Sequence, residues 1–280
     1  MTIEYRKHDV ATCINYYRDP GDGLPPEPVR ISDKTVKNER PKIATSKIIR
    51  DVTGEEVIYT LDKNGFQFIR RETKLHEADF HNSEIIERVY YAEAAQLLKE
   101  TTGADQVYIF DHKVRTGPSN WHKLGEGNRT ARGPLFRAHV DQSYAGAEIV
   151  LRRHFPDEAE KLLESRYQII NIWRPLKKVE KDPFAVADAF SIPEDDLIAA
   201  SILYPGGDRD ETWTITPNES HRWYYKYAQR PDEALLIKCF DSSISPGLAR
   251  RAPHSAFEDP QMADRDHRES IEVRALVLYR

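Results

Sequence analysis

A histidine and an aspartate stand two residues apart, at His139 and Asp141. On a β-strand, residues i and i+2 point to the same face, so both side chains can reach one ion. Two histidines and one carboxylate on one side of a metal form the facial triad of non-haem iron oxygenases, which leaves positions open for reactants. The pair, at the end of the β-prone run Phe136–Val140, therefore predicts two of the three ligands of such a site.

The His-x-Asp triplet alone is a weak signal. The chain has 10 histidines and 46 acidic residues, so chance placement gives about one or two His-x-Asp/Glu triplets. A surface or capping role is an equally good interpretation of the triplet by itself. The flanking sequence adds weight, because the turn residues Gly133 and Pro134 precede it and a helix-like stretch begins near Asp141 and Ser143.

Two histidines compete for the third ligand position. His221 is followed by an aromatic run at 223–227, which is more typical of a substrate wall or a packing surface. His254 is followed by the last β-rich segment, which begins with Arg268 and Ser270. An arginine there can grip the far carboxylate of 2-oxoglutarate with two parallel hydrogen bonds, and a serine on the same face can add a third. We therefore predict His254 as the ligand, with Arg268 and Ser270 binding the acid.

The last segment alternates in polarity, which predicts a strand with two different faces. The apolar set is expected to pack against the rest of the protein, and the polar set faces a barrel interior or solvent. Polar groups in a barrel interior are costly unless they serve a ligand or one another; an edge strand with one solvated face is the simpler alternative. Arg274 is the second candidate for the acid, or pairs with Glu272. The apolar set is Ile271, Val273, Ala275, Val277 and Tyr279, and the polar set is Arg268, Ser270, Glu272 and Arg274.

A short strand at 168–173 carries a second group of candidates. Trp173 is expected in the core, as most tryptophans at such positions are. Asn171 and Arg174 either pack locally or contact 2-oxoglutarate or the substrate. Asn171 is kept as a candidate for binding the co-substrate.

The remaining pattern predicts one mainly β domain over 1–280, with flanking helices. Residues 1–56 are rich in Pro, Asp, Arg and Lys and are expected to form an extended arm on the domain. Asn64-Gly65 predicts a tight hairpin turn between 57 and 70, and 3–4 spacing predicts helices over 83–101, 143–154 and 157–166. Many short strands favour a double-stranded β-helix, the jelly roll of cupin-like proteins. They are expected at Gln106–Phe110, Phe136–Val140, Gln168–Trp173, Ile198–Tyr204, Glu211–Ile215, Trp223–Tyr227, Ala234–Phe240, Ser255–Phe257 and Glu269–Tyr279.

Composition excludes several classes of partner. The net charge of −5 gives no concentrated basic face for nucleic acid. Cys13 and Cys239 do not form a disulfide framework and fit a reducing compartment. The N-terminus has charges where a signal peptide needs an apolar stretch, and no apolar run is long enough for a membrane helix. A cytoplasmic protein without a membrane partner is expected, and a homodimer is left open.

Several segments together resemble the gibberellin desaturase-like family of fungal and bacterial oxygenases, which includes cephem methoxylase components and fungal hydroxylases and desaturases. The resemblance runs from about Tyr59 to Tyr279, and its motifs are specific as a set. Before Tyr59 no motif matches. The segments are LDKNGFQF (61–68), TGADQVYIFDHKVR (102–115), HVDQS (139–143), NIWRPL (171–176), HRWYYKY (221–227), DEALLIKCFDS (232–242), APHSAFEDP (252–260) and RESIEVR (268–274).

This resemblance implies a double-stranded β-helix that uses Fe(II), 2-oxoglutarate and O2 to hydroxylate, desaturate or close rings on small molecules of secondary metabolism. It places the metal ligands on His139, Asp141 and His254 and the co-substrate arginine on Arg268. It also points to Tyr108, Asp111, His112 and Arg115 at the pocket mouth. Two alternatives remain: a cupin-like isomerase or hydrolase that uses zinc or manganese without needing the arginine, and a non-catalytic jelly-roll binding protein.

Overall fold

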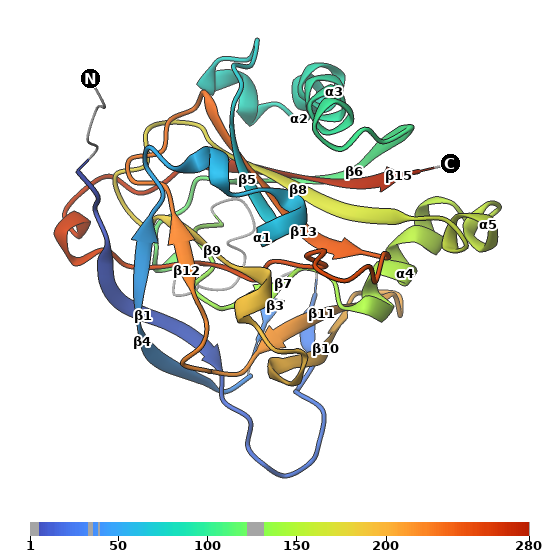
Figure 1. Cartoon of the computed structure of the whole chain (residues 1–280), viewed down its shortest axis with the longest axis horizontal. Coiled ribbons are helices and arrows are strands. Elements are labelled where there is room, and N and C mark those ends of the chain that lie inside the picture. Colours follow the sequence, from blue (N-terminus) through green and yellow to red (C-terminus); the bar gives the residue numbers. More distant parts are fainter. Residues whose placement is uncertain (1–5, 33–35, 39, 122–131, 280) are drawn as a thin grey trace.

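The computed structural model describes residues 6–32, 36–38, 40–121 and 132–279. Within these ranges, two β-sheets of ten and five strands face each other, and a helical layer lies outside the smaller sheet (Figure 1). The main core lies between the sheets, because it combines residues of the larger sheet, such as Ile14 and Trp223, with residues of the smaller one, such as Ile169 and Leu276. The prediction of a mainly β jelly roll with flanking helices is confirmed.

The five-stranded sheet is antiparallel throughout. Its strand order is β5-β13-β8-β15-β6, so β6 forms one edge. Its three long inner strands, β13, β8 and β15, are buried along almost their whole length. The strands are β5 (Phe66–Arg70), β13 (Glu233–Asp241), β8 (Tyr167–Pro175), β15 (Ser270–Leu278) and β6 (Gln106–Arg115).

The ten-stranded sheet holds the short strands of the site in its middle. Its order is β1-β4-β12-β9-β14-β7-β11-β10-β2-β3. The strands are β1 (Val10–Tyr17), β4 (Lys42–Asp51), β12 (Trp223–Tyr225), β9 (Phe184–Ala187), β14 (His254–Ala256), β7 (His139–Val140), β11 (Arg209–Ile215), β10 (Leu197–Leu203), β2 (Val29–Ile31) and β3 (Val36–Lys37).

The helical layer lies on the outer face of the five-stranded sheet. Asn82 begins it, since its Oδ1 accepts hydrogen bonds from the amides of Glu84 and Ile85, and Gly103 ends it in a left-handed conformation. The predicted helix over 83–101 is confirmed, with one π-helical turn inside it. Its pieces are α2 (Ser83–Ile85), the π turn η3 (Ile86–Tyr90) and α3 (Tyr91–Thr102).

The other helical segments are short. The two helices predicted after the His-x-Asp pair are confirmed as α4 and α5. No helix among the described residues is long and apolar enough to span a membrane. These segments are α4 (Tyr144–His154), α5 (Ala159–Leu163), α1 (Leu61–Asn64) and the 3-10 turns η1 (Glu56–Ile58), η2 (Glu77–His81), η5 (Ala189–Ser191), η6 (Glu194–Asp196) and η7 (Pro260–Met262).

The alternation predicted for the last segment is realised in β15. Ile271 and Val273 face the helical layer and belong to its core cluster. Ser270, Glu272 and Arg274 have the opposite parity and face the space between the sheets, where Leu276 and Leu278 of the same parity join the main core. The polar set therefore faces the interior, and the interpretation as a solvated edge is wrong.

The described part of the first 56 residues, expected as an extended arm on the domain, contains strands β1 to β4, and β1 pairs with β4 over its full length. One prediction of local structure is wrong. Asn64-Gly65 does not form a hairpin. The Thr60 hydroxyl caps a single helical turn, and Gly65, at φ 82°, ends it before β5 begins. That strand pairs with β13, far along the chain, so the glycine serves a helix end.

Gly146 lets the first turn of α4 approach β11. A Cβ at this position would collide with the backbone carbonyl of Glu211, which also accepts a hydrogen bond from the amide of Ser143. We therefore expect Gly146→Ala to lower the free energy of unfolding by about 1–3 kcal/mol, as overpacking in cores does. Urea unfolding checks this, with Ala145→Gly, one residue earlier on the same helix, as the control for helix propensity. An unchanged midpoint for Gly146→Ala would contradict the close approach.

Candidate metal centre

The pairing of β7 with β14 brings two histidines together. The two strands are antiparallel, and His254 is the direct partner of His139 in the register. Opposite residues on neighbouring strands point to the same face. The ring centroids lie 4.4 Å apart, and the ring planes are inclined by 66°.

The histidine rings present their Nε2 atoms to one carboxylate oxygen. His139 Nε2 lies 3.3 Å from Asp141 Oδ1, and His254 Nε2 lies 3.8 Å from the same atom. The other ring nitrogens contact carbonyl oxygens, at 2.8 Å from Arg137 and 3.3 Å from Ala252. A carbonyl only accepts, so Nδ1 carries the hydrogen in both rings and Nε2 keeps its lone pair toward the carboxylate.

The second oxygen of Asp141 is already engaged. Asn171 Nδ2 donates to Oδ2 at 2.7 Å, and Arg274 Nη2 contacts the same oxygen at 2.9 Å. The register explains the arrangement, since Asn171 and Arg274 are direct partners in the β8–β15 pair. One oxygen is thus held by the protein, and the other faces the histidines.

Electrostatics keep Asp141 and His139 in the state that a metal requires. Burial alone would raise the pKa of Asp141, but the charge of Arg274 holds that pKa well below its usual range. Burial and the neighbouring His254 lower the pKa of His139, so its imidazole is neutral at physiological pH. A carboxylate and a neutral imidazole are the forms that bind metal.

Arg268 lies beside this site with a donor unused. Its guanidinium sits over the rings of Trp173 and Phe184, 5.2 and 5.5 Å from their centroids, and Nη1 donates to the carbonyl of Asp182 at 2.8 Å. Nε is buried and has no partner. Phe184 in turn lies against the ring of His254, at 5.6 Å. The arginine is therefore fixed next to the histidines with a donor free for a ligand.

The donor set fits Fe(II). Two imidazole nitrogens and one carboxylate oxygen from a buried His-x-Asp…His arrangement are the ligands of the facial triad. Among the described residues, His139, Asp141 and His254 form a cluster whose ligand atoms all lie within 4.8 Å of one another. Buried polar atoms without a partner are uncommon in folded proteins and call for an explanation. His254 Nε2 is such an atom, and a metal would satisfy it.

His221, the other candidate for the third ligand, lies away from the His139–Asp141–His254 cluster. His221 is buried in the core with both ring nitrogens occupied, by the hydroxyl of Tyr16 at 3.1 Å and a carboxylate oxygen of Asp196 at 2.9 Å. Trp173 is buried as predicted, and its ring stacks on Phe184. His221 therefore contributes to packing and has no free nitrogen for the metal.

The four residues predicted at the pocket mouth do not all point to the same face of β6. Asp111 and Arg115 of β6 are the register partners of Arg274 and Ser270, so they face the metal centre. His112 faces the helical layer, where its Nδ1 lies 2.7 Å from the hydroxyl of Tyr91. Tyr108 lies against the rings of His154 and Phe155 at the end of α4, at 5.5 and 5.2 Å.

Sequence reasoning missed Lys113 at the metal centre. It stands between Asp111 and Arg115 in the period-two pattern of the strand and is the register partner of Glu272. Its Nζ lies 3.5 Å from Asp111 Oδ2. The alternation of charged residues at 111, 113 and 115 was the signal that could have found it, because period-two charge on a strand marks one face.

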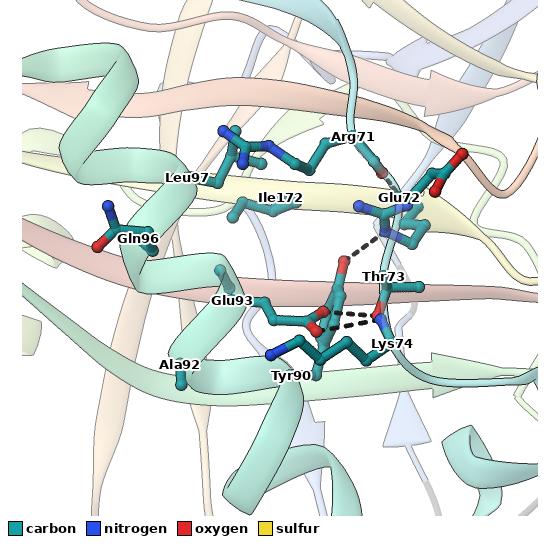
Figure 2. A pocket seen from close by; sticks show the side chains of 12 residues that line it. Arg71, Glu72, Thr73, Lys74, Tyr90, Ala92, Glu93, Gln96, Leu97 and Ile172 are labelled. Carbon is teal, nitrogen blue, oxygen red and sulfur yellow. Dashed lines mark hydrogen bonds between the residues drawn. The ribbon is translucent and has the colours of Figure 1, made fainter.

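A separate cavity lies on the far face of the same sheet. Figure 2 shows this space of about 440 Å³ between α3 and the segment at 71–74, where Glu93 accepts hydrogen bonds from Thr73 and Lys74. Ile172 and Arg174 line it, and both alternate along β8 with Asn171, which faces the metal centre. Arg174 Nε donates to the Tyr90 hydroxyl at 2.8 Å. Arg174 therefore has a packing role on the helical side and is not part of the metal centre.

Two facing sheets that enclose two histidines and a carboxylate define a jelly-roll protein with a candidate metal site. Comparison with known proteins makes the class specific. A family model described as an oxidoreductase/YMDC permease-like domain matches residues 14–278. A hydroxylase/desaturase of Hormonema carpetanum, efuI, is 35% identical over 299 residues, covering 100% of this chain and 98% of the relative.

Other relatives agree. An alpha-ketoglutarate-dependent dioxygenase of a fungal species, phiK, is 31% identical and covers 99% of each chain. The solved structure of the iron and alpha-ketoglutarate-dependent endoperoxidase NvfI superposes with a TM-score of 0.82 at 26% identity, covering 97% of this chain and 98% of that one. The chain belongs to this family of fungal hydroxylase/desaturases and Fe(II)/2-oxoglutarate-dependent dioxygenases.

Proposed function

We propose that His139, Asp141 and His254 bind Fe(II), and that Arg268 and Ser270 bind the far carboxylate of 2-oxoglutarate. The observation that carries the proposal is the convergence of two histidine Nε2 atoms and one oxygen of Asp141 in a buried site. The free Nε of the buried Arg268 supports the second part. A buried guanidinium with an unused donor is suited to a carboxylate ligand.

The chain is an Fe(II)/2-oxoglutarate-dependent dioxygenase of fungal secondary metabolism, and it oxidises a C–H bond of a small molecule by hydroxylation, desaturation or ring closure. When bound, iron and 2-oxoglutarate supply an oxidant derived from dioxygen, and the co-substrate leaves as succinate and carbon dioxide. The protein supplies orientation and a dry pocket. We no longer propose the alternative function, a metal-dependent isomerase or hydrolase, because relatives that match nearly the whole chain are named as a hydroxylase/desaturase and a dioxygenase.

The residues around the iron have separate tasks in this proposal. His139 and His254 are held in one tautomer by carbonyl oxygens, so each offers Nε2 without rearrangement. Trp173 and Phe184 stack at 4.9 Å and form an apolar wall beside His254. This wall excludes water from the space in which the substrate is oxidised.

The sequence made Asn171 and Arg274 candidates for binding 2-oxoglutarate, but we propose a different role for both. Both already contact Oδ2 of Asp141, so we assign them to orienting the metal carboxylate. Arg274 is itself fixed by Glu272, whose Oε1 lies 3.1 Å from Nε and 3.0 Å from Nη2. Partners of this kind orient metal ligands and typically contribute about 10–100-fold to metal affinity.

We expect Asn171→Ala and Arg274→Ala each to weaken Mn(II) or Fe(II) binding by about 10–100-fold while the fold is retained. Asp141 would then be free to rotate, and either oxygen could face the metal. Anaerobic calorimetric titration measures the affinity. Gln168→Ala is the matched control, because Gln168 lies on β8 like Asn171 but donates a hydrogen bond to Asp241, away from the candidate metal site. Equal metal affinity in all three variants would contradict the assignment.

Activity is tested by measuring succinate formed from 2-oxoglutarate under oxygen with Fe(II), with and without fungal extracts as a source of substrate. We expect extract-stimulated succinate release from the wild-type enzyme and only background from His139→Ala. If both proteins gave the same background with an extract that contains the substrate, the proposed site would be wrong.

We propose further that residues 1–280 form one catalytic domain. The strands of the larger sheet come from residues 10 to 256 and those of the smaller sheet from 66 to 278, so both sheets use most of the chain. A cytoplasmic location is supported by the free thiols of Cys13 and Cys239. A homodimer stays a prediction, and size-exclusion chromatography with light scattering would test it.

A further inference from the structure

Arg115 lies near the candidate metal centre and, like Arg268, forms no ion pair with a carboxylate of the described residues. It ends β6 as the direct register partner of Ser270, so its side chain points to the same face as Ser270. Its Nη1 donates to the backbone carbonyl of Gly133 at 3.0 Å. Because β6 is the edge strand beside β15, Arg115 closes one side of the space into which Ser270 points.

The neighbouring carboxylates are all in contact with a different arginine. Arg274 contacts Glu272 at 3.0 Å, Asp141 at 2.9 Å and Asp111 at 3.4 Å. In the described part of the chain, neither Arg115 nor Arg268 forms an ion pair with a carboxylate. Arg274 therefore contacts all three carboxylates, and Asp111 is also contacted by Lys113. The guanidiniums of Arg115 and Arg268 remain without a carboxylate partner among the described residues.

The two unpaired guanidiniums affect each other. Burial lowers the pKa of Arg268, and the positive charge of Arg115 lowers that pKa further. Burial likewise lowers the pKa of Arg115, against the opposing effect of Glu272. Arginine stays charged at neutral pH, so the site contains two like charges that repel. A carboxylate beside both would replace this repulsion with attraction and restore the hydrogen bonds lost on burial.

We propose that Arg115 is the second arginine of the co-substrate site, and that it shares the far carboxylate of 2-oxoglutarate with Arg268 and Ser270. This rests on the proposed function, since it assumes that 2-oxoglutarate binds beside Arg268. The carboxylate has two oxygens and can accept from both guanidiniums and the hydroxyl at once. Arg115 and Ser270 are direct partners on neighbouring strands, so the strand pairing fixes their spacing, and Arg268 lies two residues before β15 begins.

Binding of 2-oxo acids to the Mn(II)-loaded protein tests this without turnover. Isothermal titration calorimetry compares 2-oxoglutarate with 2-oxopentanoate, which keeps the oxo-acid end and lacks the far carboxylate. We expect Arg115→Gln to weaken 2-oxoglutarate by about 10–100-fold, as loss of hydrogen bonds to a charged group does. Binding of 2-oxopentanoate should stay the same, and Arg115→Lys should recover part of the loss.

His112→Gln is the matched control, because His112 lies on the same edge strand with its side chain on the opposite face. It should bind both acids as the wild type does. Unchanged binding of 2-oxoglutarate in Arg115→Gln overturns the inference, and so does an equal loss for both acids. If wild-type protein binds 2-oxoglutarate no better than 2-oxopentanoate, or if Arg268→Gln has no effect, the proposed function itself fails.

Discussion

Replacing His254 by alanine is expected to remove Fe(II) binding and 2-oxoglutarate-dependent succinate formation, whereas replacing His221 leaves both in place. The loss for His254→Ala should exceed the ~10–100-fold cost of losing a residue that only orients a ligand. Its Nε2 is 3.8 Å from Asp141 Oδ1 and has no other partner, so the metal loses one of three protein ligands.

His221→Ala is the matched control, because both histidines are buried and only one faces the metal centre. Loss of the His221 ring leaves the Tyr16 hydroxyl and the Asp196 carboxylate with one partner fewer. We expect a decrease of about 1–3 kcal/mol in the free energy of unfolding. Metal titration and thermal unfolding of both variants separate the two roles. Retained metal binding in His254→Ala, or its loss in a folded His221→Ala protein, would contradict the choice of ligand.

Replacing Arg268 by glutamine is expected to give the second-largest effect. The apparent KM for 2-oxoglutarate should rise by about 100-fold or more, because a two-point contact between a buried guanidinium and a carboxylate is lost. Arg268→Lys should restore only part of this, since an ammonium cannot form two parallel hydrogen bonds. Iron affinity should remain near that of the wild type, because the guanidinium contacts the Asp182 carbonyl and two rings but no metal ligand.

A second variant distinguishes loss of co-substrate binding from a folding defect. Lys177→Gln is the control: it removes the contact of Lys177 with Glu269 at 2.9 Å, a partly exposed ion pair next to the start of β15. It should leave the KM for 2-oxoglutarate unchanged. If Arg268→Gln is folded and has the wild-type KM, Arg268 does not bind the co-substrate, and the proposed function fails in this part.

The proximity of His139 and Asp141 was predictable because their spacing matches the period of a strand. His139 and Asp141 lie in one short run, and period two is visible in sequence. The third ligand was different, since His254 is joined to His139 by the pairing of β7 with β14. Sequence could point to it only through the later Arg268 and Ser270, because strand pairing over such a distance leaves no local pattern.

The parity of the last strand was also predictable, but the partners of its polar residues were not. Arg274 was expected to pair with Glu272 or to bind the acid. It does contact Glu272, and its other contact is the metal carboxylate, Asp141. That contact joins β15 of one sheet to the residue after β7 of the other. Contacts between sheets depend on how the sheets face each other, which periodicity does not encode.

The strands that were missed have weak sequence signals. In β4, Lys42–Asp51, most side chains are exposed, and the alternation of apolar and polar residues is poor. It is held by pairing with β1 on one side and with β12, from the far end of the chain, on the other. β9 has only four residues, and all are buried, so no period can be read from it. Tertiary pairing decides both strands, which is why local propensity did not find them.

The most direct test of the account is the position of iron and 2-oxoglutarate in anaerobic crystals of the protein, located by anomalous diffraction at the iron edge. We expect one iron bonded to His139 Nε2, His254 Nε2 and Asp141 Oδ1. Oδ2 should remain on Asn171 and Arg274, and the far carboxylate of 2-oxoglutarate should lie on Arg268. Iron bound elsewhere, or bound without either histidine, would contradict it.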